Sequence, residues 1–359
     1  MIADISGYTG YLAGVELDHA QDILADLMST IVTSFRPGFR LAKLEGDAAF
    51  MFLIADRLDG SLLLDTIERC YFDFRRRRRD VQQATSCECN ACVRIPDLNL
   101  KFVVHHGTIL RQLVAGSEEL LGPDVILVHR LLKNDVVAST GIQAYALLSQ
   151  QCVDAMDLDV AALGMRAARE TYEHIGEVSV WVHDLNQRWM EEEARTRVIV
   201  DEREAVFRFD TPTSAPPQVV WEFMTAPGKR LGWQFGVTGV EVTATGNRRG
   251  VGATNHCLHG GAASIEELLD WRPYDYYTYR NTVPSPMGAV TFLTTVELEP
   301  SAAGTIVHYR FASPQTDEGR AILEQLKPWL DDALDQSTAR LRQLLDAELE
   351  RQARTHSPA

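Results

Sequence analysis

Three features are scarce in this sequence of 359 residues: long apolar runs, positive charge and cysteine. No stretch of 18 apolar residues occurs, so we expect no transmembrane helix. No basic segment followed by an apolar core stands at the N-terminus, so we expect no secretory signal and a cytoplasmic protein. Lysine and arginine number 35 against 50 acidic residues, which gives a net charge of −15. Such a chain repels nucleic acid and anionic membranes unless a local patch overrides the balance.

One basic patch stands out, the five-arginine run Arg75–Arg79, at the end of a helix expected over residues 55–80. It could bind nucleic acid or lipid headgroups, or it could be a solvated helix end, where cations also suit the helix dipole. In so acidic a chain we favour the helix end, and we expect no nucleic-acid partner.

Four of the six cysteines lie between residues 70 and 92. Cys87, Cys89 and Cys92 fall within six residues, a spacing that suits a thiolate Zn²⁺ site with Cys70 or a histidine, His105 or His106, as a fourth ligand. Redox chemistry and plain reduced cysteines are the alternatives. Without a secretion signal we expect no structural disulfides.

The length suggests two domains of about 150 residues each. Apolar residues recur at three- and four-residue steps over residues 17–35, which predicts an amphipathic helix. Residues 39–44 and 48–53 read as strands around a tight turn that contains Asp47. Residues 143–156 read as a short helix.

Asp4 stands at the end of the first strand, before a loop that contains Gly7 and Thr9. Two carboxylates, Asp4 and Asp47, can hold Mg²⁺ or Mn²⁺ against a phosphate chain. The loop precedes a helix, whose first amides favour an anion. The alternative is that Asp4 is a capping residue and Asp47 a turn former.

The sequence Asp-Ile-Ser-Gly-Tyr-Thr from Asp4, with Lys-Leu-Glu-Gly-Asp ending at Asp47, resembles the catalytic domain of class III nucleotidyl cyclases. Val104–Gly107 and Gly122–Leu131 are similar to a strand end and a helix of that family. The resemblance covers about residues 1–187. It implies a ferredoxin-like α/β sandwich, a nucleoside triphosphate partner, metal at the two aspartates and a homodimer.

The resemblance also assigns roles to single residues. Lys43 and Glu119 would read the purine, Gly7 and Thr9 would lie at the nucleotide, and Arg130 would be the catalytic, transition-state arginine. The family's catalytic asparagine is replaced here by Ile126, which cannot hydrogen-bond. Loss of one such donor costs about 10²–10³ in rate. We therefore expect nucleotide binding with weak or no cyclisation to a cyclic nucleotide.

Residues 188–202 are charged and helix-prone and form the expected linker. A second domain is expected over residues 203–352. Six strand patterns separated by turn signals follow one another between residues 237 and 313, and a long helix follows over residues 317–354.

Val220-Trp221-Glu222-Phe223 and the later Trp233 resemble the START-like, or SRPBCC, superfamily. That resemblance implies a helix-grip fold, in which a curved antiparallel sheet wraps a long C-terminal helix and leaves a mostly apolar cavity. His259 is a further candidate for a polar group in the cavity. The alternative for the aromatic residues is that they simply fill the core. The expected lining consists of Trp233, His256, Trp271, Tyr277, Tyr279 and Phe292.

Two hypotheses follow for this α+β chain. In the first, a divergent cyclase-like domain binds a metal-nucleotide and is coupled to a domain that binds a hydrophobic small molecule or lipid. In the second, the protein is a hydrophobic-ligand carrier, and the N-terminal domain serves only as a dimer scaffold.

Overall fold

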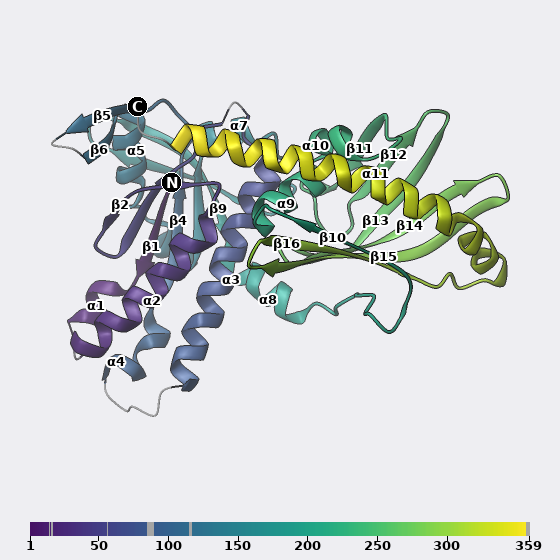
Figure 1. Ribbon diagram of the computed structural model, residues 1–359. Helices are drawn as coiled ribbons and strands as arrows, with labels where there is room; N and C mark the ends of the chain where they lie inside the picture. The colour runs from purple at the N-terminus through teal and green to yellow at the C-terminus, as the bar shows by residue number, and fades with distance from the viewer. Residues whose placement is uncertain (14, 16, 56, 85–89, 115–116, 357–359) are drawn as a thin grey trace. The chain divides into compact units, whose positions relative to one another are not determined.

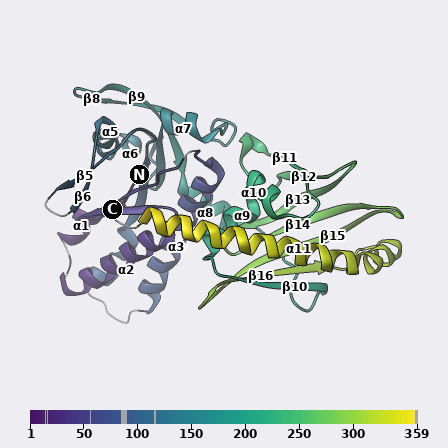
Figure 2. The ribbon, with the colours of Figure 1, turned by 45° about the horizontal axis from the view of Figure 1, so that its top comes forward.

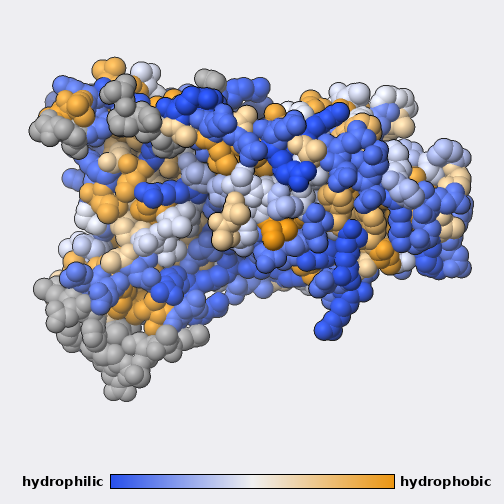
Figure 3. All heavy atoms as spheres, in the orientation of Figure 1, coloured by the Kyte–Doolittle hydropathy of each residue, from blue (hydrophilic) through white to orange (hydrophobic). Residues whose placement is uncertain are grey.

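The computed structural model describes the whole chain except residues 14, 16, 56, 85–89, 115–116 and 357–359. The described chain is a mixed α+β structure in two compact units, Met1–Arg195 and Thr196–Ala359, each with its own sheet (Figure 1). Hydrophilic side chains cover much of the face displayed in Figure 3, in keeping with the excess of acidic residues. Among the described residues no helix is long and apolar enough to cross a membrane.

The first unit alternates strands and helices. Its elements are β1 (Ile2–Ser6), α1 (Tyr8–Leu12), α2 (Leu17–Phe35), β2 (Arg40–Glu45), β3 (Ala48–Phe52), α3 (Gly60–Ala84), α4 (Asn90–Val93), η1 (Ile95–Asp97), β4 (Asn99–Val104), β5 (Leu110–Val114), β6 (Ser117–Leu121), α5 (Pro123–Leu131), α6 (Val136–Thr140), β7 (Tyr145–Ser149), α7 (Gln150–Met156), β8 (Arg166–Tyr172), β9 (Gly176–Asp184) and α8 (Leu185–Ala194).

The seven strands of its main sheet run in the order β2-β3-β1-β4-β7-β9-β8, and β4 and β7 are parallel. Helices α2, α3, α7 and α8 pack with one apolar core, which contains Ala3 and Ile5 of β1. Helices α5 and α6 contribute to a second core on the opposite side, which contains Ile2. Alternate residues of β1 therefore feed both cores, and β1 lies inside a two-sided sandwich.

The helix expected over residues 143–156 is half wrong. Residues 145–149 form β7, in the interior of the sheet, and only residues 150–156 are helical. All five residues of β7 are buried. A strand buried on both faces shows no alternation of apolar and polar residues, so periodicity could not separate it from a helix.

The run Arg75–Arg79 lies on α3, and its side chains are engaged within the first unit. These contacts agree with a structural role for the run. The partners are Tyr71 and Asn186 for Arg75, Asp73 for Arg76, Asp26 for Arg77, the carbonyls of Pro96 and Leu98 for Arg78, and Glu193 for Arg79.

The described part of the second unit is a single antiparallel sheet with three α-helices and one short 3₁₀ helix. Its elements are β10 (Ala205–Thr213), α9 (Pro217–Thr225), α10 (Pro227–Trp233), β11 (Gly239–Thr243), η2 (Thr245–Asn247), β12 (Thr254–His259), β13 (Ala262–Arg272), β14 (Tyr276–Ser285), β15 (Gly288–Ser301), β16 (Gly304–Ala312) and α11 (Asp317–His356).

Its strands run in the order β10-β16-β15-β14-β13-β12-β11. Helix α11 runs along one face of this sheet beside α9 and α10, as Figures 1 and 2 show from two directions. We call this helix-covered face the inner face and the opposite one the outer face. On β14, Tyr277 and Tyr279 belong to the inner face, and Tyr276 and Thr278 to the outer face, because side chains alternate along a strand.

Strand β13 contains a β-bulge, because its register with β14 shifts between Leu268 and Asp270. Leu269 is the extra residue. Asp270 is fully buried and accepts hydrogen bonds from the Val198 amide at 2.9 Å and the Tyr276 hydroxyl at 3.0 Å. The bulge thus holds the segment that enters the second unit against the outer face.

Candidate functional site

The two aspartates expected to bind metal lie close together in the first unit. The amide of Ile5 donates to the carbonyl of Asp47 at 2.9 Å, which places the turn between β2 and β3 beside the end of β1. Partial burial and the neighbouring Asp4 carboxylate raise the pKa of Asp47. Paired carboxylates that repel one another are a donor set that a divalent cation would stabilise.

Lys101 of β4 already neutralises part of this charge. Its ammonium lies 3.0 Å from the Asp4 carboxylate, and the two side chains are only 19% and 15% exposed. A cation bound by Asp4 and Asp47 would therefore compete with this ion pair. Sequence reasoning missed Lys101 because only the register of β1 against β4, which pairs Asp4 with Lys101, brings it to the site.

The two residues expected to read a purine are also neighbours. Lys43 on β2 lies 3.1 Å from Glu45 and 3.9 Å from Glu119 on β6. Glu45 in turn lies 3.2 Å from His129 on α5. Lys43 is about half exposed, so this group forms a partly solvated charged cluster.

The remaining cyclase-derived positions are exposed. Arg130 and Ile126 both lie on α5 with exposed side chains, and among the described residues no ion pair or hydrogen bond involves the Arg130 guanidinium. Gly7 precedes α1 with a φ of 88°, and a Cβ there would lie 2.8 Å from the Asp97 carbonyl oxygen. Thr9 lies in α1 and is exposed.

The cysteine site lies mostly outside the described residues: Cys87 and Cys89 are there, as is the side chain of Cys92. Cys70 lies in the apolar core of α2 and α3 with no exposed surface, and burial raises its pKa well above the usual value. No cluster of three ligating side chains occurs in the described part of the chain. The Zn²⁺ site stays a prediction.

His105, at the end of β4, belongs to a polar cluster at the start of α5. Its Nδ1 lies 2.8 Å from the hydroxyl of Ser149, and its Nε2 lies 3.1 Å from Asp124. Although desolvation opposes it, hydrogen bonds from His105 and from the Thr108 amide lower the pKa of Asp124. Both ring nitrogens of His105 are engaged and its side chain is 3% exposed, so the cluster holds the strand end and α5 together.

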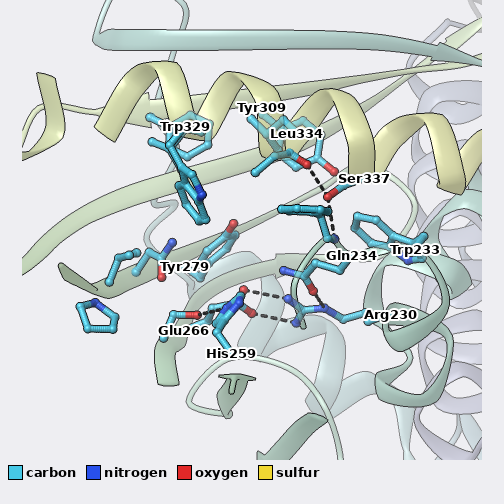
Figure 4. A pocket seen from close by; sticks show the side chains of 18 of the residues that line it. Arg230, Trp233, Gln234, His259, Glu266, Tyr279, Tyr309, Trp329, Leu334 and Ser337 are labelled. Atoms are coloured by element: carbon cyan, nitrogen blue, oxygen red, sulfur yellow. Dashed lines mark hydrogen bonds and ion pairs between the residues drawn. The ribbon is translucent and has the colours of Figure 1, made fainter. Parts of the chain in front are cut away.

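The second unit contains a cavity of about 250 Å³ between the inner face of the sheet and helices α10 and α11 (Figure 4). Most of its lining is apolar or aromatic, a composition typical of small-molecule sites. Its lining comprises Arg230, Trp233, Gln234, Phe235, His259, Ala262, Ser264, Glu266, Tyr277, Tyr279, Asn281, Val283, Pro284, Tyr309, Phe311, Trp329, Leu330, Ala333, Leu334 and Ser337.

A buried ion pair forms one wall of the cavity. Two nitrogens of Arg230 each lie 2.8 Å from an oxygen of Glu266, as the dashed lines of Figure 4 show. Asn255 donates to Glu266 at 3.0 Å, and Gln234 accepts from Arg230 at 3.1 Å. Despite desolvation, the pKa of Glu266 is lowered by Arg230, because the guanidinium stabilises its charged form.

Three of the six residues expected in the lining are there: Trp233, Tyr277 and Tyr279. Sequence reasoning did not select Arg230, Glu266 or Tyr309. The sequence offers a signal for Glu266 alone, because it lies two residues from other inner-face positions of β13. Arg230 comes from a separate element, helix α10.

The other three expected residues, His256, Trp271 and Phe292, are not among the lining residues. Alternation along β12 puts His256 on the outer face, and His259 lines the cavity instead. Trp271 packs edge-on against Trp221 and Phe292 against Phe311, so both fill the core.

Two protein families match the chain. Residues 205–346 match the family described as polyketide cyclase/dehydrase and lipid transport, so the second unit contains a domain of SRPBCC type. Residues 24–140 match a family described as a protein of unknown function, DUF2652. These matches identify a family for the second unit and do not identify the first unit as a nucleotidyl cyclase.

A curated relative and several solved structures are similar to this chain. The uncharacterized protein Rv2561/Rv2562 of Mycobacterium tuberculosis is 35% identical over 162 residues, which are 45% of this chain and 73% of the relative. The structure of MLL2253 from Mesorhizobium loti is 20% identical and covers 39% of this chain and 96% of its own, with a TM-score of 0.32. NE0264 from Nitrosomonas europaea is 15% identical, covers 42% and 99%, and has a TM-score of 0.33.

Proposed function

The chain belongs to the same family as the uncharacterized Mycobacterium tuberculosis protein Rv2561/Rv2562, and from the geometry of its own second unit we propose that it binds a hydrophobic small molecule or lipid. The observation that carries the proposal is the cavity of about 250 Å³ on the inner face of the sheet. The family description of residues 205–346, which includes lipid transport, supports it.

The lining suits an apolar, flat ligand. Tyr277 and Tyr279 are stacked, with ring centroids 5.9 Å apart and planes 22° apart. Trp233 and Leu330 are buried in the lining. Trp329 is 48% exposed. A ligand would bury apolar surface at about 25 cal/mol per Å², minus the cost of its immobilisation.

The test uses the full chain. Small molecules that co-purify are extracted and identified by mass spectrometry, and binding of a fluorescent hydrophobic probe is titrated. Ala333→Phe adds a ring to a cavity-lining position of α11, and Ala321→Phe adds the same ring at an exposed position outside the lining. Loss of probe binding in Ala333→Phe alone is the expected result. Equal binding by both variants would exclude this cavity.

A second function is carried by the proximity of Asp4 and Asp47. We propose that these two carboxylates hold Mg²⁺ or Mn²⁺ with a nucleoside triphosphate, and that Lys43 and Glu119 contact its purine. Asp47 would be a principal ligand of the metal, because burial and the Asp4 carboxylate raise its pKa and a cation would relieve that unfavourable charge. The metal would supply charge stabilisation at the phosphates, and Arg130 would lie near them only if a second copy of the chain completes the site.

This second proposal is tested by equilibrium binding of ATP and GTP with Mn²⁺, with products resolved by mass spectrometry. Asp47→Asn removes one carboxylate, and Glu173→Gln does so at a position 87% exposed in the same unit. Metal-dependent binding that disappears only in Asp47→Asn would support the proposal. Binding that is unchanged in Asp47→Asn would refute it, and light scattering would show whether binding requires a dimer.

A further inference from the structure

The charges inside the cavity are already compensated. The ionisable groups of its lining, apart from tyrosines, are Arg230, Glu266 and His259. Arg230 and Glu266 neutralise each other through two hydrogen bonds of 2.8 Å, and their side chains are 9% and 7% exposed. His259 lies 3.3 Å from Ser264. The lining therefore offers no uncompensated charge for a charged ligand.

A charged ligand would enter this site at a large cost. Its charge would lose water without gaining a counterion, which is expensive in a buried site. A carboxylate could bind Arg230 only by displacing Glu266, and Glu266 would then be left buried and unpaired. An uncharged ligand leaves the ion pair intact.

Two polar atoms of the described lining have no partner, and the first is the hydroxyl of Tyr309. Tyr309 is 4% exposed, and its hydroxyl is buried without a hydrogen bond to any described residue. Burial raises the pKa of Tyr309, so the hydroxyl keeps its proton and can donate. Buried polar groups nearly always have a partner, and an orphan calls for an explanation. A ligand oxygen that accepts from this hydroxyl supplies one.

A second orphan lies on the same face of the sheet. The carboxamide oxygen of Asn281 is buried and unpartnered, and Asn281 stands opposite Glu266 in the register of β13 and β14. Tyr309 offers a donor, Asn281 offers an acceptor, and the stacked Tyr277 and Tyr279 lie on the strand that carries Asn281. Figure 4 shows Tyr309 and Tyr279 among the side chains of the cavity.

We propose that the cavity selects an uncharged, largely apolar ligand whose hydroxyl or carbonyl oxygen accepts a hydrogen bond from Tyr309. This inference rests on the proposed hydrophobic-ligand function and narrows it: ligands with an ionised carboxylate or phosphate are rejected. A hydroxyl on the ligand can also donate to Asn281.

The test uses three probes of equal ring size on the full chain at pH 7: naphthalene, 2-naphthol and 2-naphthoate. Naphthol should bind at least about tenfold more tightly than naphthoate. Tyr309→Phe should weaken naphthol binding by about 3- to 10-fold, the range for one net hydrogen bond, and leave naphthalene binding unchanged. Tyr172→Phe is the matched control, because it removes another buried, unpartnered hydroxyl, in the first unit.

The outcomes distinguish a failure of the selectivity for uncharged ligands from a failure of hydrophobic-ligand binding itself. Naphthoate binding as tightly as naphthol, or an equal loss of naphthol and naphthalene binding in Tyr309→Phe, overturns the selectivity while hydrophobic binding stands. Failure of all three probes to bind overturns both, provided circular dichroism shows that the protein is folded.

Discussion

Replacing Arg230 by methionine should destabilise the second unit severely. Glu266 would remain as a buried carboxylate whose guanidinium partner is gone, with only neutral side-chain donors, Asn255 and Cys257, beside it. Breaking a buried ion pair from one side typically costs about 3–5 kcal/mol. The double variant Arg230→Met with Glu266→Gln should recover much of that loss, because it removes both charges.

A matched control lies on the same sheet. Arg280 pairs with Glu267 between β13 and β14, but both side chains are 46% exposed. Exposed pairs contribute about 0–1 kcal/mol, so Arg280→Met should change the free energy of unfolding by less than about 1 kcal/mol. Urea unfolding followed by tryptophan fluorescence gives both values, with circular dichroism used to detect separate transitions of the two units.

The ion pair also predicts a pH dependence. Because the pKa of Glu266 is lower in the folded protein than its ordinary value of 4.5, its contribution is fully present above pH 4.5. It is lost as the pH falls through the lowered folded value. Glu266→Gln should therefore flatten the acid side of the stability profile. A cost below 1 kcal/mol for Arg230→Met, or an acid profile unchanged by Glu266→Gln, would refute a tightly desolvated pair.

Three further substitutions test other parts of the structure. Gly107→Ala should cost about 1–3 kcal/mol, because its Cβ would fall 2.3 Å from a carboxyl carbon, while Gly10→Ala meets nothing within 4 Å; thermal unfolding compares them. Asp270→Ala should lower the free energy of unfolding by about 2–4 kcal/mol, because the Val198 amide and the Tyr276 hydroxyl lose their acceptor. It should also speed proteolysis of the segment that Asp270 holds. Asp47→Asn should gain a few tenths of a kcal/mol at pH 7, because it ends the burial of a charge and its repulsion with Asp4. This gain should vanish below the ordinary carboxyl pKa of 3.8, where the wild-type group is protonated.

Local patterns predicted most of the elements. The helix over residues 17–35 and the six strands between residues 237 and 313 were found because each has a period that a short window reveals. The long final helix was found for the same reason. β7 was missed because a strand buried on both faces has no alternation to read.

The site was harder to predict than the elements. Asp4 and Asp47 lie close together. Lys101 joins them only through the register of two strands distant in sequence. His256 lies on the outer face of β12 and His259 lines the cavity, and residue type alone cannot tell the two histidines apart. Trp271 was an expected lining residue, but it packs edge-on against Trp221, a contact that only the tertiary structure reveals.

The extra residue in β13 has a consequence for insertions and deletions in this family. With Leu269 present, Asp270 stands opposite Thr278 of the outer face and Trp271 opposite Tyr277 of the inner face. If β13 kept Leu269 but paired it regularly, Leu269 would stand opposite Thr278 and the next two residues would change faces: the Asp270 carboxylate would enter the apolar interior, and the Trp271 indole would leave it. A homologue that lacks this one residue therefore keeps both its apolar core and its attachment of the incoming segment, whereas one that keeps the residue but loses the bulge must rebuild the two together.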